Sequence, residues 1–386
     1  MPAPARRVWR AAALEVADLR CWRRARIELP EGLVVVSGPN GAGKTSLVEA
    51  LVLATMGVSP RTAQLAELVR DGAPAVHVAA DVTGPGTSGI PSTRELGYAA
   101  GIGRRLVADG EPVRQLLRWR LPGSVLVFAP EELRAVKGPP AARRRALDRL
   151  LEAVDPAVAL DLLEHQRLLA QRNALLRRIR AGESPVSALG PWDAQLAPVA
   201  ARITLARRRE VAALSAPFAR WLRDLGGEEG GMLALESSQS VEGDPDEAAL
   251  AEALAARMAG MRPREVAAGM TLGGPHRDDV WIGTEGHDLR RLGSQGEQRT
   301  AALAMLLAHR ERLRDGGTTP IMLLDDVLSE LDPDRRAALL AAVDDGSGQV
   351  LITSAEPEGQ SVMGARSATV IRVREGRVAA TASLPA

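Results

Sequence analysis

The sequence predicts an α/β protein in which a P-loop nucleotide-binding head is interrupted by a helical lobe. A glycine-rich loop at residues 38–45 follows the apolar run 33–36 and precedes a helical pattern. A second apolar run, 321–324, ends in two aspartates. Between these motifs, residues 141–223 have few glycines and repeat leucine at helical spacing. We therefore expect three parts: the N-terminal part of the head at 1–140, the inserted helical lobe at 141–265 and the C-terminal part of the head at 266–386.

The loop at residues 38–45 reads Gly-Pro-Asn-Gly-Ala-Gly-Lys-Thr and fits the phosphate-loop pattern G-x-x-x-x-G-K-[ST]. Glycines let the backbone turn sharply and aim consecutive N–H groups at phosphate oxygens, and a helix N-terminus adds partial positive charge. We expect Lys44 to reach the β- and γ-phosphates and the Thr45 hydroxyl to bind Mg²⁺. The alternative is an ordinary glycine-rich turn before a helix. The predicted nucleotide contacts from this segment are Gly38, Pro39, Asn40, Gly41, Ala42, Gly43, Lys44, Thr45 and Ser46.

The composition singles out the same loop. The chain has two lysines, Lys44 and Lys137, and arginine supplies the rest of its 49 basic residues. It also has two asparagines, Asn40 and Asn173. A lysine offers a compact point charge where arginine offers a wide planar fork, so a lysine in so arginine-rich a chain indicates a position that arginine cannot fill. The same argument marks Lys137 and Asn173 more weakly.

The bulk composition limits the class of protein. A chain of 386 residues with 46% hydrophobic residues has room for two or three domains with real cores. The net charge of +1 excludes a global basic field, so any nucleic-acid surface must be a local patch. Nine aromatic residues are too few for a surface built on stacked bases. One cysteine, no long apolar run and no signal peptide favour a cytoplasmic protein with no membrane partner.

The remaining elements of the head follow from apolar patterning and turn residues. A glycine- and proline-rich loop is expected at 84–92, and a hairpin at 94–107 turns near Gly101 and Gly103. After residue 269 strand character returns, and helices are expected at 297–314 and 333–343. The predicted strands are 11–16, 26–29, 33–36, 75–82, 125–128, 320–324 and 349–353.

Leucines at 162, 169 and 176 recur every seven residues and place an apolar stripe on one face of a helix. Pro156 suits the start of this helix, and Gly182 with Pro185 suits its end. Two further helical stretches are expected at 192–225 and 247–261. A helix of about 25 residues spans only roughly 37 Å. We therefore interpret the lobe as a helix bundle and not as a long coiled coil.

The apolar run 321–324 and the two acids after it have the form of a Walker B element. A strand buried on both faces delivers its last residues to the carboxyl edge of the sheet, where ligands gather. We expect Asp325 to bind Mg²⁺ and Asp326 to polarise the attacking water, so that Asp326 and Lys44 are the predicted catalytic residues. The alternative is a strand that ends in a solvated acidic turn.

Residues 292–299 read Leu-Gly-Ser-Gln-Gly-Glu-Gln-Arg and resemble the signature motif of ABC-type ATPases. A hydroxyl and glycine N–H groups at a helix start form a second phosphate site, which predicts contacts from Ser294 and Gly296. In that superfamily the signature of one subunit closes over the γ-phosphate bound by another. Residues 329–332 match the D-loop that follows Walker B there. Thr353 or Ser354 occupies the switch position, where transporters usually carry histidine, and Thr353 is therefore a predicted nucleotide contact. An ordinary capped helix start is the alternative for 294–298.

The spacing of these motifs is too long for a transporter module and far too short for the arms of SMC proteins. Further phrases in matching order make the chain resemble the RecF family, over about residues 10–355. Arg20 matches a family position and is a weaker candidate for a nucleotide contact, although the phrase around it departs from the family form. The phrases that carry the resemblance are Phe128–Leu133, Lys137–Pro140 with Arg143, Arg144 and Arg145, Gln171–Leu176, Gly274–Asp279 and Leu324–Asp332.

The resemblance implies an ABC-type ATPase head that binds ATP and Mg²⁺ and dimerises around two nucleotides. Proteins of this family bind DNA, preferring duplex near single-strand gaps, and cooperate with RecO and RecR to load recombinase. Slow, DNA-dependent hydrolysis resets the dimer. The resemblance thus implies roles in DNA repair, DNA replication and the SOS response.

Backbone contacts to DNA are expected from arginine clusters, with a solvated helix face as the alternative for each. A different functional class, an ABC-type module energising a membrane or other partner complex, would require a shorter insertion, a glutamine loop and a switch histidine. A third hypothesis is a scaffold whose ATP site only orders partners. His276 and Arg277 can be structural or functional, and residues 226–246 match no pattern. The candidate DNA contacts are Arg143, Arg144, Arg145, Arg177 and Arg178, with Arg180 and residues 207–209 as further members.

Overall fold

The structure, a computed structural model, describes residues 7–384 except 86, 88, 89, 228, 239–242, 244, 286 and 356–366. It divides into two compact units. We call Met1–Leu133, Trp221–Gly227 and Ala302–Ala386 the sheet unit, and Arg134–Arg220 with Glu228–Ala301 the helical unit. The predicted boundaries at residues 140 and 265 rest only on the change in the spacing of apolar residues, and they stay predictions.

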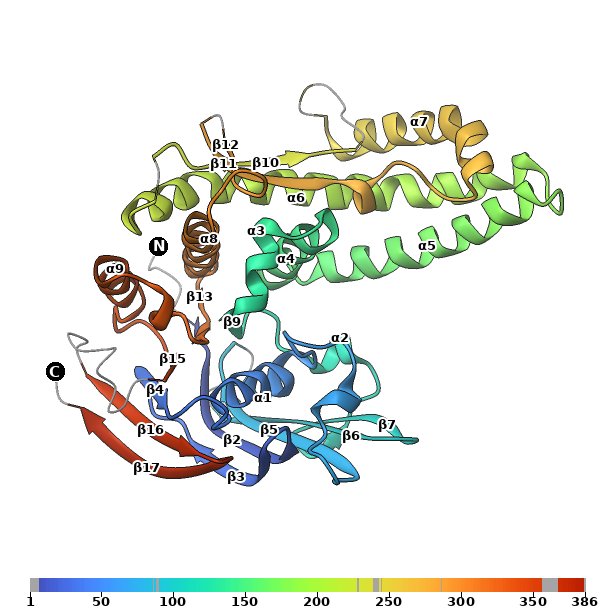
Figure 1. Cartoon of the computed structure of the whole chain (residues 1–386). Helices are drawn as coiled ribbons and strands as arrows, with labels where there is room; N and C mark the ends of the chain where they lie inside the picture. Colours follow the sequence, from blue (N-terminus) through green and yellow to red (C-terminus); the bar gives the residue numbers. More distant parts are fainter. Residues whose placement is uncertain are drawn as a thin grey trace. The chain divides into compact units, whose positions relative to one another are not determined.

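A mixed six-stranded sheet positions both nucleotide motifs of the sheet unit (Figure 1). Its order is β17-β16-β4-β15-β14-β9, and β16, β4, β15, β14 and β9 run parallel while β17 is antiparallel to β16. Because parallel strands end at one edge, the residues that follow β4, β14 and β15 meet there. The strands are β4 (Leu33–Ser37), β9 (Val125–Phe128), β14 (Ile321–Leu324), β15 (Val350–Ser354), β16 (Ala368–Arg374) and β17 (Arg377–Leu384).

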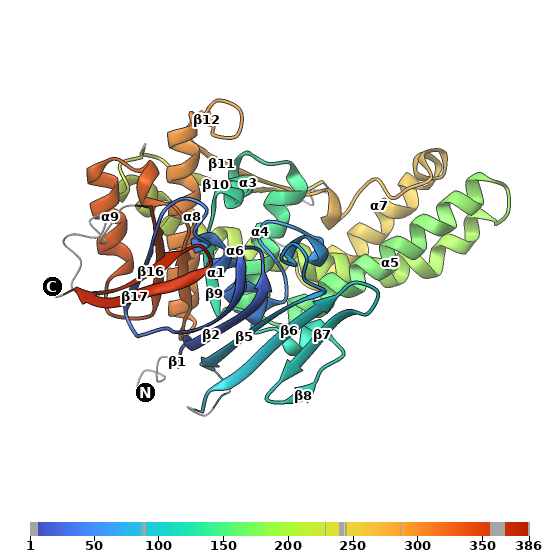
Figure 2. The ribbon, with the colours of Figure 1, turned by 60° about the horizontal axis from the view of Figure 1, so that its bottom comes forward.

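The second sheet of this unit is antiparallel, with the order β3-β2-β5-β6-β7-β8 (Figure 2). It is a meander, except that β5 lies next to β2 instead of β3, because the chain passes through β4 and the first helix in between. A short parallel pair joins β1 (Arg7–Val8) to β13 (Thr318–Thr319). The strands are β2 (Arg10–Leu19), β3 (Trp22–Glu28), β5 (Ala75–Thr83), β6 (Ser92–Ala99), β7 (Gly103–Ala108) and β8 (Glu111–Pro112).

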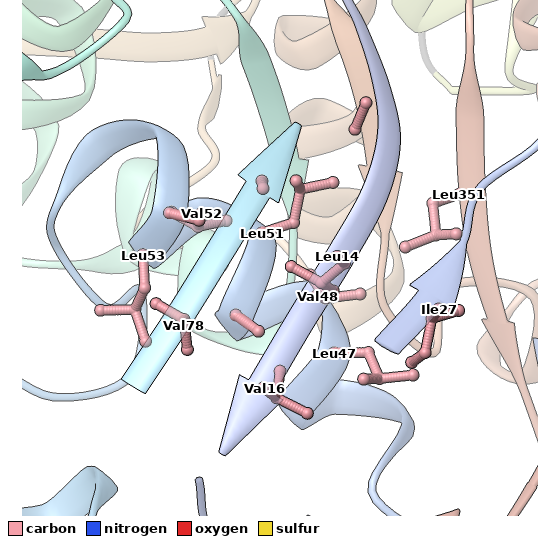
Figure 3. Close-up of a cluster of buried hydrophobic side chains, with 14 of the residues drawn as sticks. Leu14, Val16, Ile27, Leu47, Val48, Leu51, Val52, Leu53, Val78 and Leu351 are labelled. Carbon is pink, nitrogen blue, oxygen red and sulfur yellow. The ribbon is translucent and has the colours of Figure 1, made fainter. Parts of the chain in front are cut away.

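Helix α1 (Lys44–Met56) packs against both sheets and is almost wholly buried. Its Leu47, Val48 and Leu51 contribute to one apolar cluster with Leu14 of β2 and Leu351 of β15 (Figure 3). Burying a leucine or valine side chain stabilises a fold by about 1.5–3 kcal/mol, so this cluster fixes the helix that follows the phosphate loop. The shorter helices of the unit are α2 (Leu116–Trp119) and α9 (Pro333–Val343), with 3₁₀ turns at Leu65–Leu68, Pro130–Leu133 and Leu328–Glu330.

Three long helices make the core of the helical unit, and they run side by side (Figures 1 and 2). They are α5 (Ala157–Arg180), α6 (Gly190–Asp224, whose last turn belongs to the sheet unit) and α7 (Glu247–Ala268). Leu168, Ile203 and Leu254 pack in their shared core. Helices α3 (Arg134–Lys137) and α4 (Pro140–Val154), 3₁₀ turns at Val186–Leu189 and η4 (Pro275–Arg277), and the three-stranded sheet of β10 (Met232–Glu236), β11 (Asp279–Thr284) and β12 (His287–Asp288) complete this unit. Helix α8 (Gln295–Asp315) begins here and continues in the sheet unit.

Most predicted elements are confirmed to within a few residues, including the hairpin that turns at Gly101 and Gly103 and the helix after Pro156. The hairpin β16–β17 is absent from the prediction, because the buried Val370, Ile371 and Val373 of β16 do not alternate strictly and the register shifts between Arg372 and Val373. In the part of the chain that the structure describes, no helix is long and apolar enough to cross a bilayer. The unmatched region 226–246 is only partly described: residues 232–236 form β10, and several others lie outside the described residues.

Candidate nucleotide site

The phosphate loop joins β4 to α1, and two of its glycines are required by close packing. Gly43 has φ 105°, and a Cβ there would lie 2.4 Å from Nε1 of Trp22. The Trp22 indole donates a hydrogen bond of 3.0 Å to the Gly43 carbonyl. A Cβ at Gly38 would lie 2.2 Å from the carbonyl oxygen of Val373 in β16. Pro39, Asn40 and Gly41 form the exposed rim of the loop, whereas Ala42 and Ser46 are buried beneath it.

Lys44 is the first residue of α1, and its side chain folds back over the loop. Its Nζ donates to the carbonyl oxygens of Gly38 at 2.8 Å and Pro39 at 3.1 Å. Burial lowers the pKa of Lys44, and the carboxylates of Asp326 and Asp325 oppose this shift. A phosphate group at the loop would offset the desolvation of this ammonium, so the geometry suits an anionic ligand.

Two hydroxyls converge on one oxygen of Asp325 at the end of β14. Thr45 Oγ1 donates to Asp325 Oδ1 at 3.0 Å, and Thr353 Oγ1 donates to the same oxygen at 2.7 Å. Asp325 is only 3% exposed, and burial raises its pKa, although these two hydrogen bonds lower it. Carboxylate and hydroxyl oxygens are the donor set that Mg²⁺ prefers. The residues present therefore fit the predicted metal ligands, Thr45 and Asp325.

Asp326 has a left-handed backbone with φ 51°, which is unusual for a residue other than glycine and typical of functional sites. Its N–H donates to Thr353 Oγ1 at 2.9 Å, and Ser329 Oγ donates to its Oδ1 at 2.8 Å. The Thr353 hydroxyl thus bridges the two aspartates and is 1% exposed. The structure shows the Thr353 hydroxyl bonded to both aspartates, and its nucleotide contact stays a prediction.

Arg20 lies in the turn between β2 and β3 and pairs with Glu49 of α1 at 3.2 Å. Glu49 is fully buried, and Ser59 and Arg61 also reach it. Arg61 lies 3.7 Å from Glu131, whose charge in turn raises the pKa of Asp325. Arg20 was a weaker candidate for a nucleotide contact and stays a prediction, whereas Glu49 was not predicted. An acidic residue in a continuous apolar helix face was the available signal.

Ser294 directly precedes α8 and forms a reciprocal cap with Glu297. The backbone N–H of Ser294 donates to Glu297 Oε2 at 2.6 Å, and the N–H of Glu297 donates to Ser294 Oγ at 3.3 Å. This is a capping box, which satisfies two backbone donors at a helix start. Ser294 and Gly296 are both exposed in the helical unit, so they are accessible to another molecule.

The predicted DNA-contacting arginines fall into two groups. Arg143 is buried, and its guanidinium donates hydrogen bonds to both carboxylate oxygens of Asp279. Its side chain therefore forms an internal ion pair and does not lie on the surface. Arg207 is likewise buried, against Asp148 and Asp278. Arg145, Arg177, Arg178, Arg180 and Arg209 are exposed, and Arg144 and Arg208 are half-buried.

A buried ion cluster in the helical unit has no counterpart in the sequence analysis. Arg172 is 0% exposed and pairs with Asp193 at 2.8 Å and Glu265 at 2.7 Å. Its neighbour Asn173 accepts hydrogen bonds of 2.8 Å from the N–H and the hydroxyl of Thr271. The rare Asn173 therefore has a structural partner, whereas the other flagged residue, Lys137, is exposed.

Comparison with known proteins places this geometry in a family. The AAA domain family matches residues 13–73, which include the phosphate loop. The DNA replication and repair protein RecF of Heliobacterium modesticaldum is 36% identical over 367 residues, covering 95% of this chain and 98% of that protein. The RecF of Acidothermus cellulolyticus is 38% identical, covering 92% and 95%. The chain belongs to the RecF family. It is therefore a P-loop ATPase, as the motifs predicted.

Solved structures agree with RecF membership. The recombination mediator protein RecF-ATP in the RecFOR pathway has a TM-score of 0.86 and 26% identity, covering 98% of this chain and all of that one. The RecF-ATPrS structure has a TM-score of 0.85 and 28% identity. An SMC head bound to the winged-helix domain of ScpA has a TM-score of 0.56 at 15% identity, a likeness of fold alone. The predicted fold, a P-loop ABC-type ATPase head with an inserted helical lobe, is confirmed.

Proposed function

We propose that this chain is an ATP-dependent DNA-binding clamp of replication and recombinational repair. In this proposal it uses ATP and Mg²⁺, dimerises on ATP, helps load recombinase on gapped DNA and hydrolyses ATP slowly. The observation that carries the proposal is the convergence of Lys44, Thr45 and Asp325 at the loop between β4 and α1. Its RecF relatives are described as DNA replication and repair proteins, and two solved relatives as ATP forms in the RecFOR pathway.

Each residue of the site has a separate task in this proposal. The loop N–H groups and Lys44 hold the β- and γ-phosphates, and Lys44 exchanges its two carbonyl partners for phosphate oxygens. Thr45 and Asp325 hold Mg²⁺, which neutralises charge on the phosphates when bound. Asp326 orients the attacking water.

The site is completed in trans. Ser294 and Gly296 are exposed at the start of α8, where N–H groups and a partial positive charge suit a phosphate. A second copy of the chain would bring this turn to the γ-phosphate of the first. ATP then couples to dimerisation because it makes contacts in the dimer that it does not make in the monomer.

DNA is held by backbone phosphate contacts from exposed arginines. Arg145, Arg177 and Arg178 have exposed side chains in the helical unit, and Arg143 supports α4 from inside through Asp279. Phosphate contacts position a protein without reading sequence, which suits a protein that recognises gapped duplex by structure. RecO- and RecR-like mediators are the proposed protein partners.

The test is ATP turnover with and without gapped duplex DNA. Lys44→Arg should abolish turnover, because a wide planar guanidinium replaces a compact point charge at the phosphates. Asp326→Asn should retain ATP binding and lose hydrolysis, and Asp325→Asn should weaken Mg²⁺-dependent binding. A Lys44→Arg protein that turns over ATP at the wild-type rate would overturn the assignment of the site. Turnover that gapped DNA leaves unchanged would overturn the DNA-dependent function.

A further inference from the structure

The helical unit contains a polar cavity of about 300 Å³, lined by α4, α5, α6 and η4. Leu162, Ile203 and Pro275 provide an apolar wall. The polar lining comes from Arg144, Arg145, Asp148, Arg207 and two histidines. A volume of this size is at the lower end of the range for small-molecule sites, which combine apolar walls with a few convergent polar groups.

The arginines around this cavity do not all have carboxylate partners. Both oxygens of Asp148 accept hydrogen bonds from Arg207, at 2.9 Å each, and Asp278 pairs with Arg207 as well. Asp279 is held by Arg143. Arg144 donates only to the backbone carbonyl of Asp278, and Arg145 only to the carbonyl of Ala141 in its own helix. Among the described residues, neither Arg144 nor Arg145 has a carboxylate within ion-pair distance.

Burial makes the charged form of Arg144 unfavourable, because its guanidinium has no carboxylate within ion-pair distance among the described residues. Burial and the nearby charge of Arg207 lower its pKa, and the charges of Asp278, Asp279 and Asp148 oppose this shift without cancelling it. A half-buried guanidinium without a carboxylate is stabilised when an anion supplies charge-assisted hydrogen bonds. The two consecutive arginines on α4 therefore leave a positive charge directed at the cavity.

Two histidines on the cavity wall are also without full hydrogen bonding. His165 is 6% exposed, and within the described part of the chain its ring nitrogens make no hydrogen bond. The ring of His276 lies 5.7 Å from it, and its buried Nδ1 atom lacks a partner among the described residues. Its Nε2 is 3.4 Å from the carbonyl of Thr271. Buried polar atoms without partners are rare, and here they mark where a ligand's polar atoms would fit.

We propose that this cavity binds a nucleotide through its phosphate monoester, with the phosphate on Arg144 and Arg145 and the sugar or base against Leu162 and the two imidazoles. A phosphate monoester carries up to two charges and three terminal oxygens, which matches two guanidinium groups better than a single carboxylate does. The cavity has room for more than a phosphate ion, and histidine rings and aliphatic side chains pack against flat bases. The inference needs only the cavity and does not rest on the P-loop site.

The ligand can come from two sources, a free nucleoside monophosphate or the phosphorylated end of a DNA strand. Binding of dTMP and of thymidine to the full chain is measured by calorimetry in phosphate-free buffer, without and with saturating ATP. A second set of titrations compares a short single strand that has a 5′-phosphate with the same strand that has a 5′-hydroxyl. We expect dTMP to bind and thymidine not to bind, and ATP to leave dTMP binding unchanged. A preference for the 5′-phosphate strand identifies the strand end as the source, and equal binding of the two strands identifies the free nucleotide.

Arg144→Gln and Arg145→Gln should each weaken dTMP binding by about tenfold or more, because each removes charge-assisted hydrogen bonds. Arg149→Gln removes the same charge from the exposed face of α4 outside the cavity and should leave dTMP binding unchanged. Arg145 is exposed and bonds only within its own helix, so its variant should fold normally. The proposal is overturned if dTMP fails to bind, if ATP displaces it, or if all three variants lose affinity equally.

Discussion

Replacing Thr353 with valine should remove the hydrogen bonds that link Asp325 and Asp326, the two residues after β14. The substitution keeps the side-chain shape and removes one hydroxyl, which donates to Asp325 at 2.7 Å and accepts from the N–H of Asp326 at 2.9 Å. A hydrogen bond to a charged group contributes about 1.5–3 kcal/mol, and an unsatisfied buried N–H costs about 1–3 kcal/mol. Since the effects of hydrogen bonds within one network are not additive, we expect the free energy of unfolding of the sheet unit to fall by about 2–4 kcal/mol.

The assay is thermal unfolding, combined with ATP binding at varied Mg²⁺ concentration. For a unit of this size, such a loss should lower the Tm by roughly 5–12 °C. Loss of the Thr353 hydrogen bond should also raise the pKa of Asp325 further, so the variant should need more Mg²⁺ as the pH falls. Thr353→Ser keeps both hydrogen bonds and loses one buried methyl group, about 0.8 kcal/mol. If valine and serine variants unfold at the same temperature and need the same Mg²⁺, the bridging role of this hydroxyl is refuted.

Two further predictions concern the helical unit. Burial lowers the pKa of His165 from 6.5 to about 3, so the unfolded chain binds the extra proton between these values. Stability is therefore retained above pH 6.5 and falls by up to about 1.4 kcal/mol per pH unit below it. His165→Gln should flatten this slope in phosphate-free buffer, whereas the exposed His287→Gln should not, and an unchanged slope would contradict the burial argument. Glu265→Leu removes one carboxylate partner of the buried Arg172 and should lower the free energy of unfolding by about 3–5 kcal/mol. The double variant with Arg172→Leu should recover part of this free energy, measured by chemical denaturation. A double variant less stable than the single one would show that the ion pair is not the source of the cost.

Local sequence patterns were enough to predict the phosphate loop and the Walker B strand, because each depends on a contiguous run. Gly38–Thr45 and Ile321–Asp326 carry their own turn residues, apolar strand and acids. The helix after Pro156 was predictable for the same reason, since its apolar positions repeat along one face.

Contacts between distant segments were not predictable in this way. Thr353 meets Asp325 only because β15 pairs with β14, and neither segment alone predicts this hydrogen bond. Arg143 and Arg207 were predicted as members of basic helix faces, yet both are buried against acids that lie more than 50 residues away in sequence. In a chain with this many arginines, composition alone does not separate an internal ion pair from a surface charge.

Sedimentation velocity on the Ser294→Arg variant tests completion of the site in trans most directly. Ser294→Ala is the matched control, because it loses the same helix cap, at about 1 kcal/mol, without adding a bulky cation. With ATP, wild type should sediment as a dimer, Ser294→Arg as a monomer that still binds ATP, and Ser294→Ala mostly as a dimer. A mixture of Ser294→Arg and Lys44→Ala chains should regain some dimer, since one of its two composite sites has both parts intact. An ATP-dependent dimer of Ser294→Arg equal to that of wild type would contradict the proposal.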